Sequence, residues 1–304
     1  MSAATAAVVI AYAADAAVGE FPGRIHPVAA FGRLVALVDR EWRSPQVVGL
    51  VAATVLPLAA AGVCWAVVAG VATVGSETFR TVATALAAGV VLFATTSVRM
   101  LVSVGRQVVD ASETDTAAAR ERVRALVGRE TADLDAADLR SAAVESLAEN
   151  LADGLVAPLA AFAVGAQFSP AIGAAAAGWV KAVNTMDSML GYRSKPVGRA
   201  SARLDDAVVW LPARLTAALL AVAGGRPRAV VTARRWANEP ASPNSGWPMA
   251  TLAVVLGVRL RKPDAYDLAP ASPLPTATAA RHGVQVVTVA AGVAGLLAGV
   301  VVWF

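Results

Sequence analysis

The chain has 304 residues, of which 57% are hydrophobic and only 16% are charged, and its mean hydropathy is +0.60. A soluble domain of this size carries about 25% charged residues, so the composition argues against a soluble globular protein and favours a membrane protein. Cys64 is the only cysteine, which argues against disulfides, a thiolate metal site and Cys/His catalysis. The presence of only two histidines excludes a metal site built from several histidines.

The distribution of charge predicts where the membrane helices lie. After an apolar N-terminal segment, residues 1–18, four stretches have no charged residue: 44–76, 81–98, 154–180 and 283–304. Crossing a bilayer core of about 30 Å takes about 20 apolar residues, so three of the stretches are long enough and 81–98 is just adequate. The N-terminal segment has no basic start, and Asp15 lies where a cleavage site would be. We therefore expect a retained helix there and not a signal peptide.

Nearly all Lys and Arg residues lie in four segments, residues 19–43, 99–153, 181–206 and 226–281. The positive-inside rule places all four segments in the cytoplasm. The stretch 154–180 is then expected to be a hairpin or a re-entrant pair, broken near residues 168–170. A full span over residues 207–225 would put the most basic segment outside, so we expect a partial or interfacial helix there, completed by residues 249–258.

We therefore predict an all-α fold, a polytopic integral membrane helical bundle that forms a single domain over residues 1–304. About five to seven helices are expected to be embedded in the membrane. A cytoplasmic helical insertion is expected over residues 104–150. Within it, residues 107–139 are typical of a soluble helix pair whose charged side chains, such as Arg129 and Glu130, form a solvated face.

A first polar motif, Glu-Ser-Leu-Ala-Glu-Asn-Leu-Ala-Asp-Gly, occupies residues 145–154. On an α-helix Glu145, Glu149 and Asp153 share one face at i, i+4 and i+8, where like charges repel. Such a face is tolerated where water solvates it or where a cation neutralises it. Asn150 adds a neutral oxygen, so the motif favours a Mg²⁺ or Mg–nucleotide site, with a solvated face as the alternative.

A second motif runs from Lys181 to Arg193. Lys181, Asn184 and Ser188 share a helical face, with Asp187 beside them, and Gly191 is expected to end the helix. This group is typical of a functional site. The alternative is that the lysine only extends its ammonium from the apolar stretch toward the interface.

A third motif contains Arg203, Asp205 and Asp206 and leads to Arg214. The two arginines are suited to phosphate or carboxylate groups, and the aspartates to a cation. Alternatively, Asp205 or Asp206 is the N-cap of the next helix, and both roles are compatible.

Two turns complete the set of polar motifs. Residues 242–248, Ser-Pro-Asn-Ser-Gly-Trp-Pro, are expected to form a rigid turn around Asn244. The turn is suited to binding an anion or another ligand, and a purely structural loop is an equally good interpretation. The other turn contains Glu20 and His26; a lone histidine of this kind is more often a hydrogen-bonded structural residue.

These motifs carry a family resemblance. They read HPVAAFGRLV from His26, AVESLAENLADGLVAPL from Ala143, KAVNTMDSMLGYR from Lys181, ASARLDDAVVWLPARL from Ala200 and SPNSGWP from Ser242. With these five motifs in the same order, the chain resembles the adenosylcobinamide-phosphate synthases (cobinamide synthases) of cobalamin biosynthesis over nearly its whole length. It departs from the family's Asp-Pro in the first polar turn, where it has Glu20-Phe21-Pro22.

The resemblance implies an ATP-dependent acid–amine ligase. Such an enzyme amidates the propionate carboxylate of adenosylcobyric acid, the corrinoid substrate, with (R)-1-amino-2-propanol or its O-phosphate. On this reading Mg²⁺ and ATP are held by Glu145, Glu149, Asn150 and Asp153. The expected catalytic residues are Lys181, Asp187 and Asp205, with Asp187 or Asp205 orienting or deprotonating the amine. The expected substrate- or phosphate-binding residues are His26, Asn184, Ser188, Arg193, Arg203, Asp206 and Asn244.

The same resemblance implies a multi-pass protein of the cell membrane with its motif-bearing loops in the cytoplasm. Expected partners are the corrinoid, aminopropanol or its phosphate, membrane lipid and other cobalamin-pathway enzymes, and no nucleic acid. The sequence has no Gly-Lys-Ser/Thr phosphate-binding loop, so ATP would be held in another way. The alternatives are a transporter, which would bury carboxylates in mid-span, and a scaffold for corrinoid intermediates.

Overall fold

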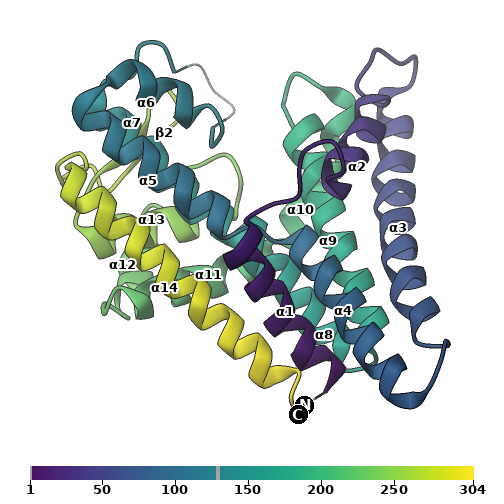
Figure 1. The fold of residues 1–304 in the computed structure, drawn as a ribbon. Coiled ribbons are helices and arrows are strands. Elements are labelled where there is room, and N and C mark those ends of the chain that lie inside the picture. The colour runs from purple at the N-terminus through teal and green to yellow at the C-terminus, as the bar shows by residue number, and fades with distance from the viewer. Residues whose placement is uncertain (1, 128–130) are drawn as a thin grey trace. The chain divides into compact units, whose positions relative to one another are not determined.

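The computed structural model describes residues 2–127 and 131–304, and it is almost entirely helical (Figure 1). Met1 and residues 128–130, including Arg129 and Glu130 of the predicted insertion, lie outside the described residues. Within them, the strands Leu260–Lys262 (β1) and Tyr266–Leu268 (β2) form one short antiparallel hairpin. The predicted all-α, polytopic membrane bundle is confirmed.

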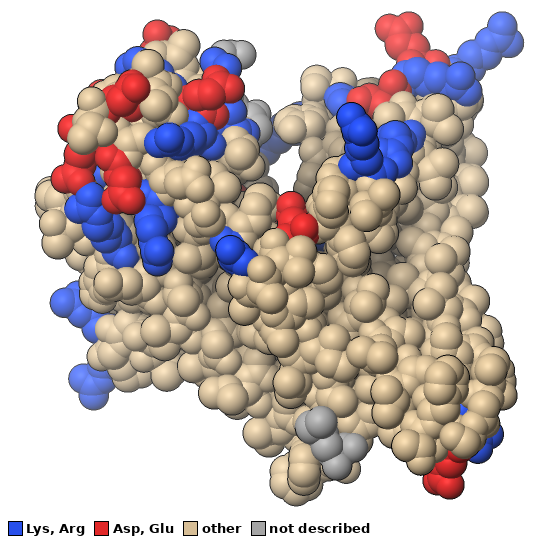
Figure 2. Space-filling view, in the orientation of Figure 1, with Lys and Arg blue, Asp and Glu red and all other residues tan. Residues whose placement is uncertain are grey.

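Four helical stretches of the described chain are long and apolar enough to cross a membrane: Pro45–Val71, Glu77–Thr114, Ala136–Ala166 and Ala277–Val301. A bent pair, Pro196–Val208 with Trp210–Ala223, makes a fifth if it counts as one span. Over α3 (Pro45–Val71) and α4 (Glu77–Thr95), the face drawn in Figure 2 has charged side chains at both ends and none along the middle. This distribution is the one that a lipid environment requires.

The described chain forms two compact units, each with its own packing. Unit 1 comprises residues 1–97, 153–209 and 295–304, and unit 2 comprises residues 98–152 and 210–294. The insertion predicted over residues 104–150 falls within unit 2, and the prediction of one membrane domain over the whole chain stays a prediction.

Unit 1 is organised around α9 (Pro170–Leu190), which packs against several neighbours. Its other elements are α1 (Ala3–Val18), α2 (Pro27–Ala36), α3, α4, the π-helical turn η1 (Ala152–Val156), α8 (Ala157–Ala166), the 3₁₀ turn η2 (Pro196–Gly198) and α10 (Arg199–Val208). Small residues let these helices approach closely. A Cβ at Gly178 of α9 would lie 2.6 Å from Sγ of Cys64 on α3, so only glycine permits this packing.

The apolar stretch 154–180 forms the predicted hairpin. Helix α8 ends at Ala166, Ser169 caps α9 by accepting from the Ile172 N–H, and Pro170 occupies the first turn of α9. A Cβ at Gly165 would lie 2.8 Å from the Ile172 carbonyl oxygen, which shows how closely the two arms pack. The predicted break near residues 168–170 is confirmed.

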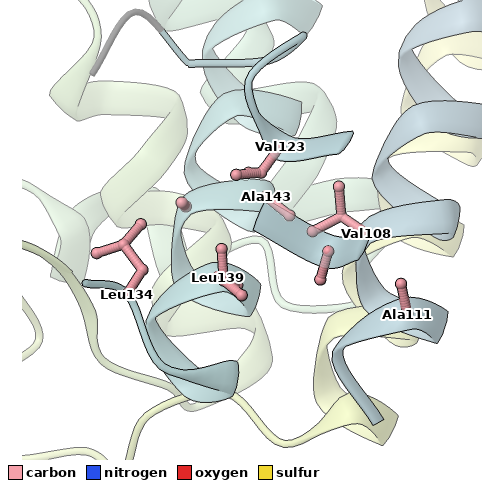
Figure 3. Close-up of a cluster of buried hydrophobic side chains, with 8 residues drawn as sticks. Val108, Ala111, Val123, Leu134, Leu139 and Ala143 are labelled. Atoms are coloured by element: carbon pink, nitrogen blue, oxygen red, sulfur yellow. The ribbon is translucent and has the colours of Figure 1, made fainter. Parts of the chain in front are cut away.

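Unit 2 consists of α5 (Arg99–Thr114), α6 (Thr116–Val123), α7 (Ala136–Leu151), α11 (Trp210–Ala223), α12 (Ala229–Ala233), α13 (Gly246–Leu256), the β-hairpin and most of α14 (Ala277–Val301). Apolar side chains of α5, α6 and α7 form a buried cluster that includes Val108, Val123 and Leu139 (Figure 3). The predicted partial helix at 207–225 corresponds to α11, which packs against α13.

Two expectations about local structure were wrong. Asp205 and Asp206 lie inside α10, which ends at Val208, so neither is an N-cap of the next helix. The α-helical spacing that aligned Glu145, Glu149 and Asp153 ends at Leu151, because residues 152–156 form a π-helical turn with more residues per turn.

Candidate functional site

The C-terminal half of α9 gathers the ionisable side chains of unit 1. Lys181 is half-buried, and its ammonium interacts electrostatically with the carboxylates of Asp153 and Glu20. Asp153 comes from the π-helical turn and Glu20 from the turn after α1. The cluster therefore combines one basic side chain with two acidic ones from distant parts of the chain.

Two hydrogen bonds of Ser97 hold this cluster together. The Ser97 hydroxyl donates to the Glu20 carboxylate at 3.3 Å, and the Ser97 N–H donates to the Gly154 carbonyl at 3.2 Å. The turn after α1, the end of α4 and the π-helical turn are thereby tied to one another. An apolar cavity of about 230 Å³ lies beside Lys181, between α2, α3, α4 and α9.

Asp187 lies two turns further along α9 and faces Asp206 of α10. Burial and the Asp206 carboxylate raise the pKa of Asp187 from 3.8 to about 6. A carboxylate with such a pKa is still ionised at neutral pH and is a stronger base than an ordinary aspartate.

The other predicted residues of the second and third motifs differ in environment. Asp205 is buried in α10, whereas Arg193 and Arg203 are exposed at the surface of unit 1. Asn184 and Ser188 lie on α9, where the Ser188 hydroxyl donates to the Asn184 carbonyl at 2.9 Å. The structure thus brings Asp187 and Asp206 together and leaves the two arginines accessible to a ligand.

His26 has a local structural role, because its Nδ1 accepts from the Val28 N–H at 3.2 Å and so caps α2. Its ring also contacts Phe21 edge-on, with a centroid distance of 5.9 Å. Its predicted part in substrate binding stays a prediction.

Glycines allow the close packing that positions the end of α9. Helix α9 ends at Leu190, as predicted, and a Cβ at Gly191 would lie 2.0 Å from Oδ1 of Asp187. A Cβ at Gly198 would lie 1.7 Å from the Leu190 carbonyl oxygen. The turn at 196–198 therefore rests directly on the end of α9, and larger residues at these positions would displace Asp187 or the turn.

In unit 2, Glu145 of α7 is 4% exposed and accepts hydrogen bonds from two hydroxyl groups. The Ser141 hydroxyl donates to Oε1 and the Tyr266 hydroxyl to Oε2, each at 2.7 Å. Next to this pair, Arg261 of β1 donates to both carboxylate oxygens of Asp138, at 2.8 and 3.2 Å. The network ties the β-hairpin to α7.

The remaining metal candidates do not form a ready cation site with Glu145. Glu149 and Asn150 are half-buried on α7, and the Asn150 amide donates to the Ser146 carbonyl at 2.9 Å. Among residues 2–127 and 131–304, no group of three or more His, Cys, Asp or Glu side chains is placed to hold a metal ion. The assignment of Mg²⁺ to these residues stays a prediction.

Asn244 is 3% exposed and anchors the turn 242–248, since its Oδ1 accepts from Nη1 of Arg214 at 2.7 Å. The turn needs glycine at its end, because a Cβ at Gly246 would lie 2.1 Å from the Ala237 carbonyl oxygen.

The interpretation of the sequence did not assign a role to Glu20, Ser97 or Tyr266. Glu20 interacts with Lys181, and Ser97 with Glu20, from distant parts of the chain, and Tyr266 lies in a hairpin without a motif. The only signal in the sequence was that Glu20 sits in a polar turn flanked by apolar stretches.

Comparison with known proteins identifies relatives over most of the chain. The probable cobalamin biosynthesis protein CobD of Methanothrix thermoacetophila is 34% identical to this chain over 276 residues. The alignment covers 86% of this chain and 84% of that protein. The cobalamin biosynthesis proteins CobD of Klebsiella pneumoniae and Mycobacterium tuberculosis are 34% and 39% identical. These matches cover 84% and 81% of this chain, and 82% and 77% of the relatives.

No solved structure matches the chain significantly. The model of the CobD/Cbib protein family, in contrast, matches residues 8–294. This match extends from α1 to the middle of α14 and includes every polar motif described above. The chain therefore belongs to the CobD/Cbib family.

Proposed function

We propose that this protein is an enzyme of cobalamin biosynthesis, an ATP-dependent ligase that forms an amide. It joins (R)-1-amino-2-propanol or its O-phosphate to the propionate carboxylate of adenosylcobyric acid. The observation that carries the proposal is the group of ionisable side chains along α9, where Lys181 faces two carboxylates and Asp187 faces Asp206. The names of the relatives support the same pathway.

Amide formation needs an activated carboxylate, because hydroxide is a poor leaving group. In the proposed reaction the substrate carboxylate attacks the terminal phosphorus of ATP, and ADP leaves. The amine nitrogen then attacks the acyl carbon, inorganic phosphate leaves, and the nitrogen loses one proton. Lys181, Arg193 and Arg203 would stabilise the negative charge on the phosphates and on the substrate carboxylate.

Asp187 is the proposed acceptor of the proton from the amine. Its pKa of about 6 leaves it ionised at neutral pH, yet closer to the pKa that favours proton transfer than that of an ordinary aspartate. Asp206, whose carboxylate contributes to this shift, acts as a positioning residue.

Mg²⁺ bound mainly by phosphate oxygens needs only one or two protein carboxylates. Asp153 fits this requirement, since it is half-buried and interacts with Lys181. Glu145 fits it poorly, because both of its oxygens already accept from hydroxyl groups. We therefore assign to Glu145 the task of holding α7, and to Asp153 the contact with the cation. Mg²⁺ would supply charge neutralisation of the phosphates.

The proposal places the protein in the cell membrane, with the polar ends of α9 and α10 in the cytoplasm where the substrates are. The basic segments that contain these motifs support this orientation. Membrane lipid and other enzymes of the pathway are the proposed partners.

The test uses the purified full-length protein in detergent, with adenosylcobyric acid, aminopropanol or its phosphate, and Mg–ATP. Mass spectrometry should detect the amide together with ADP, and product should require every component. Lys181→Met should lower the rate at least 100-fold, whereas Lys262→Met, in the hairpin of unit 2, should retain it. Absence of amide with either amine, from a protein that still binds the corrinoid, would favour a transporter or a scaffold.

A further inference from the structure

Arg214 of α11 is held rigidly in unit 2. Its Nη1 donates to the Trp210 carbonyl at 2.8 Å and to Oδ1 of Asn244 at 2.7 Å, and its Nη2 donates to the Pro243 carbonyl at 3.2 Å. The guanidinium also lies over two indole rings, 4.4 Å from the centroid of Trp210 and 5.1 Å from that of Trp247. These contacts fix both the plane and the position of the guanidinium.

All of these partners are neutral. Three other arginines of unit 2, Arg259, Arg261 and Arg281, each pair with a carboxylate, but Arg214 pairs with none among the described residues. Its Nε–H and one N–H of Nη2 also have no acceptor in the described chain. Neither of these two N–H groups is among the buried donors without a partner, so an anion can reach them in place of water.

Trp247 provides an independent sign of a ligand. Its indole Nε1–H is buried and has no hydrogen-bond partner among residues 2–127 and 131–304. Buried donors without an acceptor are rare in folded proteins, and each one destabilises the fold. The Arg214 guanidinium lies over the ring of Trp247, with its carbon 5.1 Å from the centroid, so both side chains belong to one site.

We propose that Arg214, Trp247 and the turn 242–248 bind a phosphate group. A carboxylate has two oxygens in one plane, and a bidentate contact with Arg214 would use both. A phosphate group offers a further oxygen out of that plane, which can accept from the Trp247 indole. Phosphate therefore satisfies all the unused donors at once.

Two sources of phosphate are compatible with the surroundings. Four exposed arginines of the neighbouring segment, Arg226, Arg228, Arg234 and Arg235, attract a free phosphorylated molecule. Apolar side chains of α11 are exposed close by, with Trp210 54% and Leu211 57% accessible, as expected beside the headgroup of a lipid. The shared chemistry is a phosphate ester. The site lies in unit 2 and uses none of the groups around Lys181; where its ligand is aminopropanol O-phosphate, the inference rests on the proposed function.

The test measures binding without corrinoid or ATP, so its failure is separate from failure of the ligase assay. Full-length protein in detergent is titrated with aminopropanol O-phosphate, with aminopropanol, and with inorganic phosphate, by calorimetry and by thermal shift. A parallel titration compares short-chain phosphatidic acid with the matching diacylglycerol. We expect binding only to probes that have phosphate; binding of phosphatidic acid alone identifies a lipid headgroup, and binding of the soluble phosphates identifies a free ligand.

Three variants test the residues. Arg214→Lys keeps the charge but loses the planar donors and should weaken phosphate binding at least tenfold. Trp247→Phe keeps the ring, loses only the N–H and should weaken binding about tenfold. Arg122→Lys is the matched control, because exposed Arg122 of α6 donates a hydrogen bond to a backbone carbonyl, and the affinity of this variant for phosphate should be unchanged.

The opposing hypothesis is that Arg214 only clamps the turn 242–248 onto α11. It predicts that Arg214→Lys lowers the melting temperature while the shift produced by phosphate stays as in the native protein. That outcome, or the absence of binding to every phosphate probe, would overturn the proposal. If Arg214→Lys does not fold, Trp247→Phe decides the matter, because it leaves the clamp intact.

Discussion

The raised pKa of Asp187 makes the stability of unit 1 depend on pH. Burial and Asp206 raise its pKa in the folded state from 3.8 to about 6. Between pH of about 4 and 6 the folded state therefore binds the proton more tightly than the unfolded state, and stability falls as the pH rises through this window. Asp187→Asn removes the repulsion from Asp206, so at pH 7.5 it should raise the melting temperature by roughly 2 °C and at pH 4 leave it unchanged.

The same residue predicts a shape for the pH–rate profile. If the Asp187 carboxylate accepts the proton, the rate of amide formation should decline below pH of about 6. In the Asp206→Asn variant this decline in rate should occur at lower pH, because the variant lacks one of the two causes that raise the pKa of Asp187. If the rate of the Asp206→Asn variant declined at the same pH as the rate of the native protein, Asp187 would not be the proton acceptor.

The carboxylate of Glu145 accepts one of its hydrogen bonds from the Tyr266 hydroxyl. Tyr266→Phe leaves a buried oxygen without that donor and should lower the free energy of unfolding by about 1–3 kcal/mol. Tyr192→Phe is the matched control, since Tyr192 is 49% exposed, and its effect should stay below about 0.5 kcal/mol. Thermal unfolding in detergent compares the two. Equal effects would mean that the Tyr266 hydroxyl does not support α7.

At the scale of secondary structure, close approach between elements depends on single glycines. A Cβ at Gly49 of α3 would lie 2.0 Å from the Val197 carbonyl oxygen, whereas a Cβ at Gly62 of the same helix would have no atom within 4 Å. Gly49→Ala should therefore destabilise the protein by about 3 kcal/mol or more, because η2 must move away from α3. Gly62→Ala should be neutral or stabilising by up to about 1 kcal/mol. Similar melting temperatures for both variants would contradict this packing.

At the scale of the whole molecule, the proposed orientation predicts which loops are accessible from outside the cell. Cys64 is the only cysteine, so Cys64→Ser provides a background without thiols. In that background Ser76→Cys, in the exposed turn between α3 and α4, should react with an impermeant maleimide in intact cells. Ser194→Cys, exposed after α9, should react only after the cells are opened. Labelling of Ser194→Cys in intact cells would reverse the orientation.

Periodicity and charge in the sequence were sufficient to predict the class of fold and several helix boundaries. The uncharged stretches correspond to α3, α4, the α8–α9 hairpin and α14, because burial in lipid excludes charge and leaves a continuous apolar run. Gly191 marked the end of α9, and Ser169 caps its start through a local side-chain hydrogen bond. Such features depend on neighbours in the chain, so they can be deduced without the tertiary structure.

The sequence by itself thus determined that the protein is a helical membrane protein, and its ordered motifs pointed to the family. Only the tertiary structure decided which polar residues meet. It brought Glu20 to Lys181 and the Tyr266 hydroxyl to Glu145. Contacts between residues more than a hundred positions apart depend on how helices pack against one another. Local spacing does not encode that packing, because a helix face has several neighbours with which it can pair.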